Sequence, residues 1–190
     1  MNEPDNPSAS SLAAHSPPPL PEMPPVFFPV SPLKLVIMST VTFGIYELYW
    51  FYKNWKLIKE RTGRDIMPFW RAFFGVFFCY SCFREVEEAA RFRGISFLSP
   101  GLLAAIWIIL TICWRLPDPY WLVCWLTPFV LVPVQNAINR LNIEIAPNHN
   151  RNSRFSGWNI AGIVLGGILF VLSIIGAFMP EQMPVPPGSN

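Results

Sequence analysis

The clearest feature of the chain is a set of long runs without charged residues. Residues 94–114 and 119–139 are runs of 21, and residues 155–180 are a run of 26. A helix that crosses the ~30 Å hydrocarbon core of a bilayer needs about 20 apolar residues. All three runs are therefore predicted to span a membrane. The first two are predicted to form an antiparallel hairpin, because the loop between them, Leu116 and Pro117, is very short.

Two earlier apolar runs are less regular. Residues 33–52 carry Lys34 near one end and Glu47 near the other, and charges at helix ends can reach the headgroups. Residues 66–83 hold only 12 uncharged residues after Arg71, which is ~18 Å of helix. We therefore expect 33–52 to span the membrane and 66–83 to enter and leave it on one face.

The positions of Lys and Arg distinguish the alternative topologies, because cytoplasmic loops collect basic residues. If all five runs span, the 14 basic residues divide seven to seven. With four spans, 12 of the basic residues lie on one side. If 33–52 is also re-entrant, three spans remain and 13 basic residues lie on one side. The sequence therefore predicts an all-α, polytopic transmembrane helical bundle of three to five spans, four preferred, with one re-entrant or half-depth apolar segment.

Proline marks both ends of the chain. Residues 1–32 hold 10 Pro and no Lys or Arg, and residues 179–190 hold four Pro. Proline is unfavourable in helices and favours extended polyproline II geometry. We expect two disordered Pro-rich tails around a transmembrane helical domain over 33–178. In the four-span topology both tails lie outside, and loops 53–97 and 140–154 lie in the cytoplasm.

The composition favours a membrane protein over a soluble one. Apolar residues make up 52% of the chain and charged residues 14%, whereas soluble domains carry about 25% charged residues. So few charges are too few to cover a soluble surface. The net charge of +2 is too small to indicate nucleic-acid binding. We expect membrane lipids as partners and no nucleic acid.

An aromatic and basic stretch ends the first apolar run. On a helix, Tyr46, Tyr49 and Trp50 share one face at i, i+3 and i+4, and Lys53 and Lys56 continue it. One hypothesis is an aromatic-basic collar that binds anionic headgroups of the cytoplasmic leaflet. The other is an ordinary aromatic belt with positive-inside charges.

The same stretch resembles a group of small bacterial membrane proteins that carry a domain of unknown function. Their T-x-G-[IL]-Y-x-x-Y-W pattern falls here on Thr42, Gly44, Tyr46, Tyr49 and Trp50. Residues 68–74 and 139–142 also look like that group. The resemblance covers about residues 30–178. It implies a multi-span protein of the bacterial inner membrane and assigns no activity.

Several polar residues are predicted to lie at membrane depth, where such groups face the bundle interior or a wet cavity. They are Glu47, Arg71, Asn136, Asn139, Arg140 and Asn159. Arg71 and Arg140 are candidate partners for Glu47. The set is either a network that ties helix ends together or a polar pocket for a headgroup or small solute. The pocket hypothesis makes the chain a small transporter or channel subunit that uses residues 135–142.

Cys79 and Cys82 have the C-x-x-C spacing of redox thiol pairs, so a membrane thiol oxidoreductase is a second alternative. Phenylalanines flank the pair, and apolar surroundings make thiols inert. No G-x-S-x-G, P-loop, G-x-G-x-x-G or H-E-x-x-H pattern occurs. We therefore expect no enzyme and no cofactor. The favoured function is that of an integral membrane protein acting through packing, headgroup contact or partner binding.

Small residues line one face of the last run. Gly162 and Gly166 form a G-x-x-x-G pattern, which Ser173 and Ala177 extend. Small residues let membrane helices approach closely. The stripe over 162–177 is predicted to pack either against the preceding run within one monomer or against a second copy in a homo-oligomer.

Overall fold

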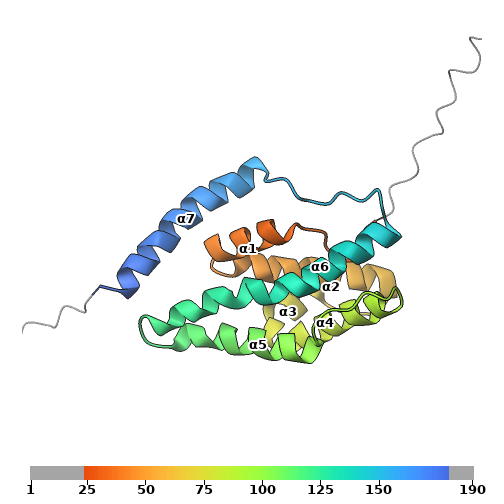
Figure 1. Ribbon diagram of the computed structural model, residues 1–190, viewed down its shortest axis with the longest axis horizontal. Helices are drawn as coiled ribbons and strands as arrows, with labels where there is room; N and C mark the ends of the chain where they lie inside the picture. The colour runs from red at the N-terminus through yellow and green to blue at the C-terminus, as the bar shows by residue number, and fades with distance from the viewer. Residues whose placement is uncertain (1–23, 180–190) are drawn as a thin grey trace, which may run out of the picture.

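The computed structural model describes residues 24–179, and this part of the chain is helical without strands (Figure 1). Residues 1–23 and 180–190, which hold most of both predicted tails, lie outside the described residues. The elements in chain order are α1 (Pro32–Val41), α2 (Ile45–Thr62), α3 (Pro68–Phe73), α4 (Gly75–Arg91), α5 (Pro100–Ile112), η1 (Cys113–Arg115), η2 (Tyr120–Leu126), α6 (Thr127–Ile145) and α7 (Gly157–Ala177).

Residues 33–52 do not form one continuous helix, which corrects the prediction of a span there. α1 ends in a turn in which Phe43 and Gly44 have φ values of 52° and 83°. The chain then reverses, so that the Phe28 N–H, before α1, donates to Asn54 Oδ1 of α2 at 3.0 Å. The 10 residues of α1 are about 15 Å long, half of a hydrocarbon core.

α3 and α4 form a second helical hairpin, whose turn lies at Phe74. At this turn Gly75 faces Phe51 and Trp107, to which an added Cβ would lie 3.9 and 3.4 Å away. Farther along, Glu85 of α4 pairs with Arg61 at the end of α2. α4 therefore runs alongside α2, and α3 leads the chain back to the α1–α2 turn.

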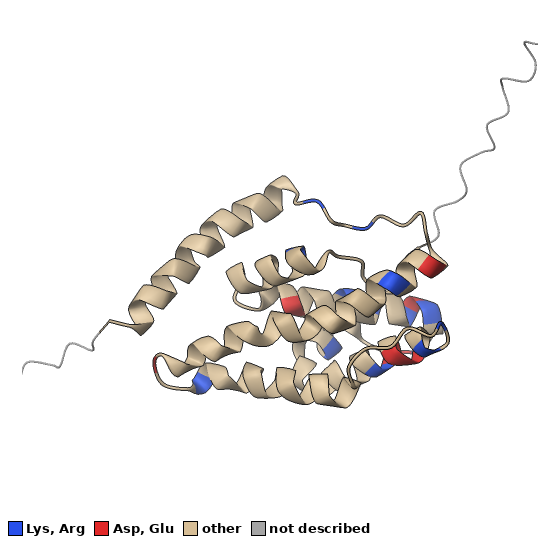
Figure 2. Cartoon of the chain, viewed as in Figure 1, with Lys and Arg blue, Asp and Glu red and all other residues tan. Residues whose placement is uncertain are grey.

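The predicted hairpin of long apolar helices is present: α5 with η1 packs against η2 with α6. Two helical stretches, Tyr120–Ile145 and Gly157–Ala177, are long and apolar enough to cross a membrane, and Pro100–Arg115 is apolar but shorter. Most charged positions gather toward one end of the bundle, where α2, α4 and α6 approach their C-termini (Figure 2). The hairpin turn with Arg115 and Asp118 lies at the opposite end.

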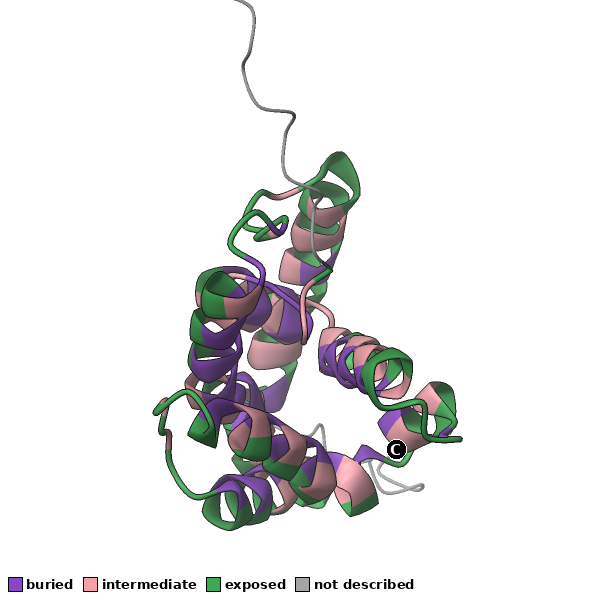
Figure 3. Ribbon diagram, turned by 90° about the vertical axis from the view of Figure 1, so that its right-hand side faces the viewer, coloured by how far each residue is buried: buried purple, intermediate pink, exposed green. Residues whose placement is uncertain are grey.

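The core lies between α1, α2, α4, α5 and α6, whose inner faces carry the buried positions (Figure 3). α7 packs mainly against α1, and only Gly166 and Ala177 of its residues are buried. Nearly all of its apolar surface is uncovered, although a soluble helix would bury such a face. This surface is suited to contact with lipid.

The N-terminal boundary of the folded part differs from the predicted one at residue 33. Phe27 and Val30 are fully buried, and Phe28 is 6% exposed. Residues 26–30 lie outside any helix, with a bend at Val26 and Phe27. They belong to the core, because three apolar side chains here pack between α2 and α6. The predicted tail over 1–32 therefore ends before this segment.

Lys34 fixes the direction in which α1 enters the bundle. Its Nζ donates to Asn152 Oδ1 at 2.9 Å and to the Arg154 carbonyl at 2.8 Å. The start of α1 therefore lies beside the 146–156 linker. This geometry does not fit the preferred four-span topology, in which the N-terminal tail and loop 140–154 lie on opposite sides of the membrane.

Candidate functional site

The polar residues of α6 hold the N-terminal segment in place. Asn142 Oδ1 accepts the backbone N–H groups of Val26 at 2.9 Å and of Phe27 at 3.2 Å. Asn142 Nδ2 donates to the Phe27 carbonyl at 2.8 Å. A segment outside helices and sheets has no regular backbone hydrogen bonds of its own, so its buried backbone groups need partners from elsewhere. One asparagine therefore satisfies three of them.

Two further α6 side chains and one from α2 extend this arrangement. Gln135 Nε2 donates to the Phe28 carbonyl at 3.2 Å and to Asn139 Oδ1 at 2.8 Å. Asn139 Nδ2 donates to the Val30 carbonyl at 2.9 Å. The spacing of these α6 positions, i, i+4 and i+7, places them on one helix face. We name the four side chains the amide clamp: Asn54, Gln135, Asn139 and Asn142.

The predicted polar cluster is thus divided among separate networks. Asn139 belongs to the amide clamp, whereas Asn136 and Arg140 are exposed on α6. The Asn159 amide oxygen, in the orientation that suits its neighbours, accepts from Lys34 Nζ at 3.0 Å. Of the polar residues over 135–142, Gln135, Asn139 and Asn142 bond the chain's own residues 26–30, whereas Asn136 and Arg140 stay exposed.

Glu47 and Arg71 do not pair with each other. Glu47 Oε2 accepts the indole N–H of Trp107 at 2.7 Å, and Oε1 accepts the hydroxyl of Thr127 at 2.7 Å. The Arg71 guanidinium carbon lies 4.5 Å from the centroid of the Trp55 ring, a cation–π contact. Glu47 therefore has the neutral partners Trp107 and Thr127, and the predicted pairing of Glu47 with Arg71 is wrong.

Glu47 lines a cavity of about 500 Å³. The cavity lies where the turns of the α1–α2 and α3–α4 hairpins meet the α5–α6 hairpin. Its aromatic wall consists of Phe43, Phe73, Trp107, Trp114, Trp121 and Trp125. Ser39 also lines it and is 1% exposed. Within residues 24–179, the Ser39 hydroxyl has no hydrogen-bond partner.

The predicted aromatic-basic collar is only in part a surface. Tyr49 is exposed, and Lys53 Nζ lies 5.8 Å from the centroid of the Phe28 ring. Tyr46 is half-buried, with its ring centroid 5.7 Å from that of Tyr49. Trp50 is fully buried instead, and its indole N–H donates to Gln135 Oε1 at 2.6 Å. Trp50 therefore packs toward α6 and the core.

Lys56, the last residue of the predicted collar, lines a second and larger hollow between α2 and α3, which we name the α2–α3 groove. It has a volume of about 700 Å³. Lys56 and Lys59 lie on its α2 side, and the large apolar residues Met67, Phe69 and Trp70 lie on its α3 side. These three side chains are 66%, 59% and 51% exposed. The groove combines cations with an uncovered apolar rim.

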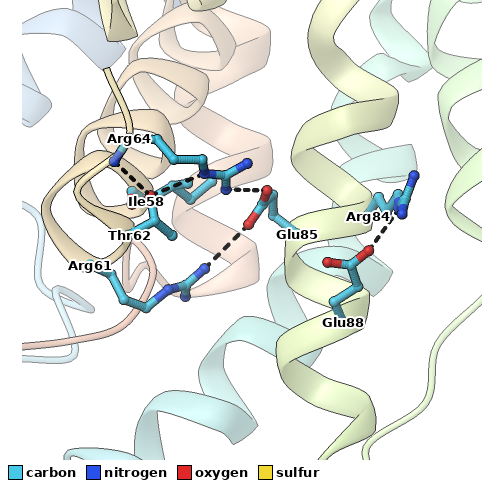
Figure 4. Close-up of polar contacts among 7 residues, drawn as sticks. All are labelled: Ile58, Arg61, Thr62, Arg64, Arg84, Glu85 and Glu88. Atoms are coloured by element: carbon cyan, nitrogen blue, oxygen red, sulfur yellow. Dashed lines mark hydrogen bonds and ion pairs between the residues drawn. The ribbon is translucent and has the colours of Figure 1, made fainter. Parts of the chain in front are cut away.

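Ion pairs tie α2 to α4 at the charged end (Figure 4). Glu85 pairs with Arg64 through one carboxylate oxygen, and its other oxygen lies 3.5 Å from Arg61 Nη2. On α4 itself, Arg84 Nε donates to Glu88 Oε1 at 2.7 Å. These carboxylates neutralise part of the basic charge, while Lys53 and Arg71 lie over aromatic rings instead.

Cys79 and Cys82 are both fully buried and carry free thiols. They belong to the core cluster together with Phe83 and Trp107. A redox partner needs access to at least one thiol of a catalytic pair, and neither sulfur has it in this state. The geometry favours their role as small core side chains.

The glycine stripe packs inside the monomer, against α1. An added Cβ on Gly166 would lie 2.1 Å from the Val41 carbonyl oxygen, and one on Gly162 would lie 4.0 Å from Met38 Cε. The intramolecular prediction named the preceding long run, now α6, as the partner. The partner is α1 instead, because the α1–α2 hairpin inserts beside α7.

Among residues 24–179, no group of three His, Cys, Asp or Glu side chains converges in a way that could hold a metal ion. Comparison with protein-family models, with curated proteins and with solved structures finds no match for this chain.

Proposed function

We propose that the chain is an integral membrane protein of the bacterial inner membrane that crosses the bilayer three times. The crossing segments are α5 with η1, η2 with α6, and α7. α1–α2 and α3–α4 are half-depth hairpins that enter from the charged end. With this topology 13 of the 14 basic residues lie on one side and only Arg115 on the other, as the positive-inside rule requires of a cytoplasmic face.

The proposed activity is the binding of anionic phospholipid in the α2–α3 groove, without catalysis. The observation that supports it is that Lys56 and Lys59 share one hollow with Met67, Phe69 and Trp70. An amphipathic rim of this kind is typical of groups at the membrane interface, where rings and long apolar side chains meet the acyl boundary. The lysines would then contact phosphate oxygens while the apolar rim contacts acyl chains.

The lysines of the groove are available for such a contact. Lys56 Nζ lies 3.9 Å from Glu60 Oε1, and Lys59 Nζ lies 3.9 Å from Asp65 Oδ1. All four side chains are about half exposed or more, and exposed pairs of this kind contribute only ~0–1 kcal/mol. One lysine near an anionic leaflet gains about 1 kcal/mol. A lipid phosphate can therefore compete with the carboxylates for both ammonium groups.

The test is the number of phosphatidylglycerol molecules that the purified protein retains, measured by native mass spectrometry. Lys56→Gln/Lys59→Gln should weaken phosphatidylglycerol binding by about thirtyfold, because two contacts of ~1 kcal/mol each are lost. The matched control is Arg91→Gln/Arg93→Gln, which removes the same charge from two exposed residues of the same end. Equal retention by both double variants would show that general charge, and not the groove, attracts the lipid.

A further inference from the structure

The cavity beside Glu47 is separate from the α2–α3 groove and is built differently. It places one carboxylate among aromatic rings, and no Lys or Arg of the described chain lines it. Glu47 is 4% exposed, so solvent does little to balance a charge there. A buried charge is costly unless paired, and the two neutral donors on Glu47 leave its charge uncompensated.

The remaining hydrogen-bonding capacity of the cavity also points to a ligand. Each Glu47 oxygen accepts one hydrogen bond, and an ionised carboxylate has about four acceptor positions. The buried Ser39 hydroxyl is unpartnered in the described structure, although buried polar groups are normally bonded. One cavity thus holds free acceptor positions on Glu47 and an unpartnered hydroxyl on Ser39.

The walls of the cavity restrict the chemical class of the ligand. Trp and Phe rings attract cations through their negative faces, and aromatic cages bind organic ammonium groups in this way. Phe73 and Phe43 are 59% and 43% exposed at the mouth. Trp114 is 61% exposed, and the Arg115 guanidinium carbon lies 5.3 Å from the centroid of its ring, so this ring already makes a cation–π contact. The mouth includes residues of the α5–α6 turn, at the end opposite most of the basic residues. An incoming cation competes there with Arg115 for the Trp114 ring.

We propose that the Glu47 cavity binds a lipophilic organic cation, with the Glu47 carboxylate opposing its charge and the aromatic wall surrounding its apolar body. The Glu47 bonds to Trp107 of α5 and Thr127 of α6 hold the carboxylate in place. The shared chemistry is an onium or ammonium centre with apolar substituents. Its source is either a free cation or the ammonium headgroup of a lipid.

The test is equilibrium binding of radiolabelled tetraphenylphosphonium to the purified full chain in detergent. Tetraphenylborate, an anion of the same shape, serves as the matched probe. The wild-type protein should bind the cation and not the anion. Glu47→Gln should weaken binding by at least about tenfold, because the only charge that opposes the cation is removed. Glu144→Gln, which neutralises an exposed carboxylate elsewhere on α6, should leave binding unchanged.

A second pair of variants keeps the test decisive if Glu47→Gln does not fold. Trp114→Ala removes an exposed ring at the mouth, and Trp158→Ala removes a ring that is 89% exposed and lies outside the cavity. Trp114→Ala alone should weaken binding, by about threefold for one cation–π contact. The proposal is overturned if Glu47→Gln or Trp114→Ala binds as the wild type does, or if tetraphenylborate binds equally well.

A competition arm identifies the source of the cation. Displacement of the probe by dihexanoyl phosphatidylethanolamine supports the proposal with a lipid headgroup as the ligand. If this lipid does not displace the probe but tetrabutylammonium does, the result supports the proposal with a free cation as the ligand. If neither competitor displaces the probe, an organic-cation site of this chemistry is excluded.

Discussion

Substitution of Asn142 by alanine tests the amide clamp most severely. Asn142→Ala removes two hydrogen bonds accepted from Val26 and Phe27 and one donated to Phe27. Each bond contributes about 1 kcal/mol net, and buried backbone groups left without partners add to the loss. We expect the free energy of unfolding to fall by about 3 kcal/mol, a large share of the ~5–15 kcal/mol that is typical of folded proteins.

The matched control for this prediction is Asn136→Ala, on the same helix but exposed. Exposed substitutions of this kind change stability by about 0.5 kcal/mol or less. Unfolding is measured by circular dichroism during titration of mixed micelles with a denaturing detergent. Chymotrypsin cleavage after Phe27, which is fully buried, reports release of the segment directly. If both variants unfold alike and Phe27 stays protected in Asn142→Ala, the clamp does not hold the N-terminal segment.

Two further predictions concern α7 and the cysteines. Gly166→Leu should lower the melting temperature, because its Cβ meets the Val41 carbonyl. The expected loss of stability is about 2 kcal/mol or more. Gly167→Leu is the control: a Cβ there meets nothing within 4 Å, so this substitution should be nearly neutral. If Gly166→Leu instead turns a wild-type dimer into an equally stable monomer by size-exclusion chromatography with light scattering, the stripe is an interface between copies. Cys79→Ala/Cys82→Ala should fold with a loss of about 1–2 kcal/mol for two small core deletions, and a Cys79–Cys82 disulfide in most acid-trapped wild-type protein would contradict a packing role.

The lengths of the apolar runs were sufficient to predict the α5–α6 hairpin and α7. Run length did not reveal the break in 33–52, because Thr42–Gly44 looks like an ordinary apolar helix interior apart from one glycine. The break depends on a turn with positive φ at Phe43 and Gly44, which packing against α7 and η2 stabilises. The rings of Phe43 and Trp125, for example, pack edge to face, with their centroids 5.9 Å apart.

The candidate sites were predictable only in part, because their partners are far apart in sequence. The polar spacing along α6 was visible, but its partners Val26 and Phe27 lie 116 and 115 residues away from Asn142. Glu47 was recognised as an unusual charge, yet its donors lie 60 and 80 residues away. Asn54, at i+4 from Trp50, gave no periodic signal that separated it from a surface residue.

The central claim is an odd number of crossings with the basic end in the cytoplasm. In a background without the four native cysteines, single cysteines are introduced at four exposed positions, Pro24, Pro117, Asn150 and Met179. An impermeant thiol reagent should label Pro117→Cys and Met179→Cys in intact cells. It should label Pro24→Cys and Asn150→Cys only after permeabilisation. Labelling of Pro24→Cys in intact cells while Asn150→Cys stays protected would contradict the three-crossing account and restore a spanning first helix.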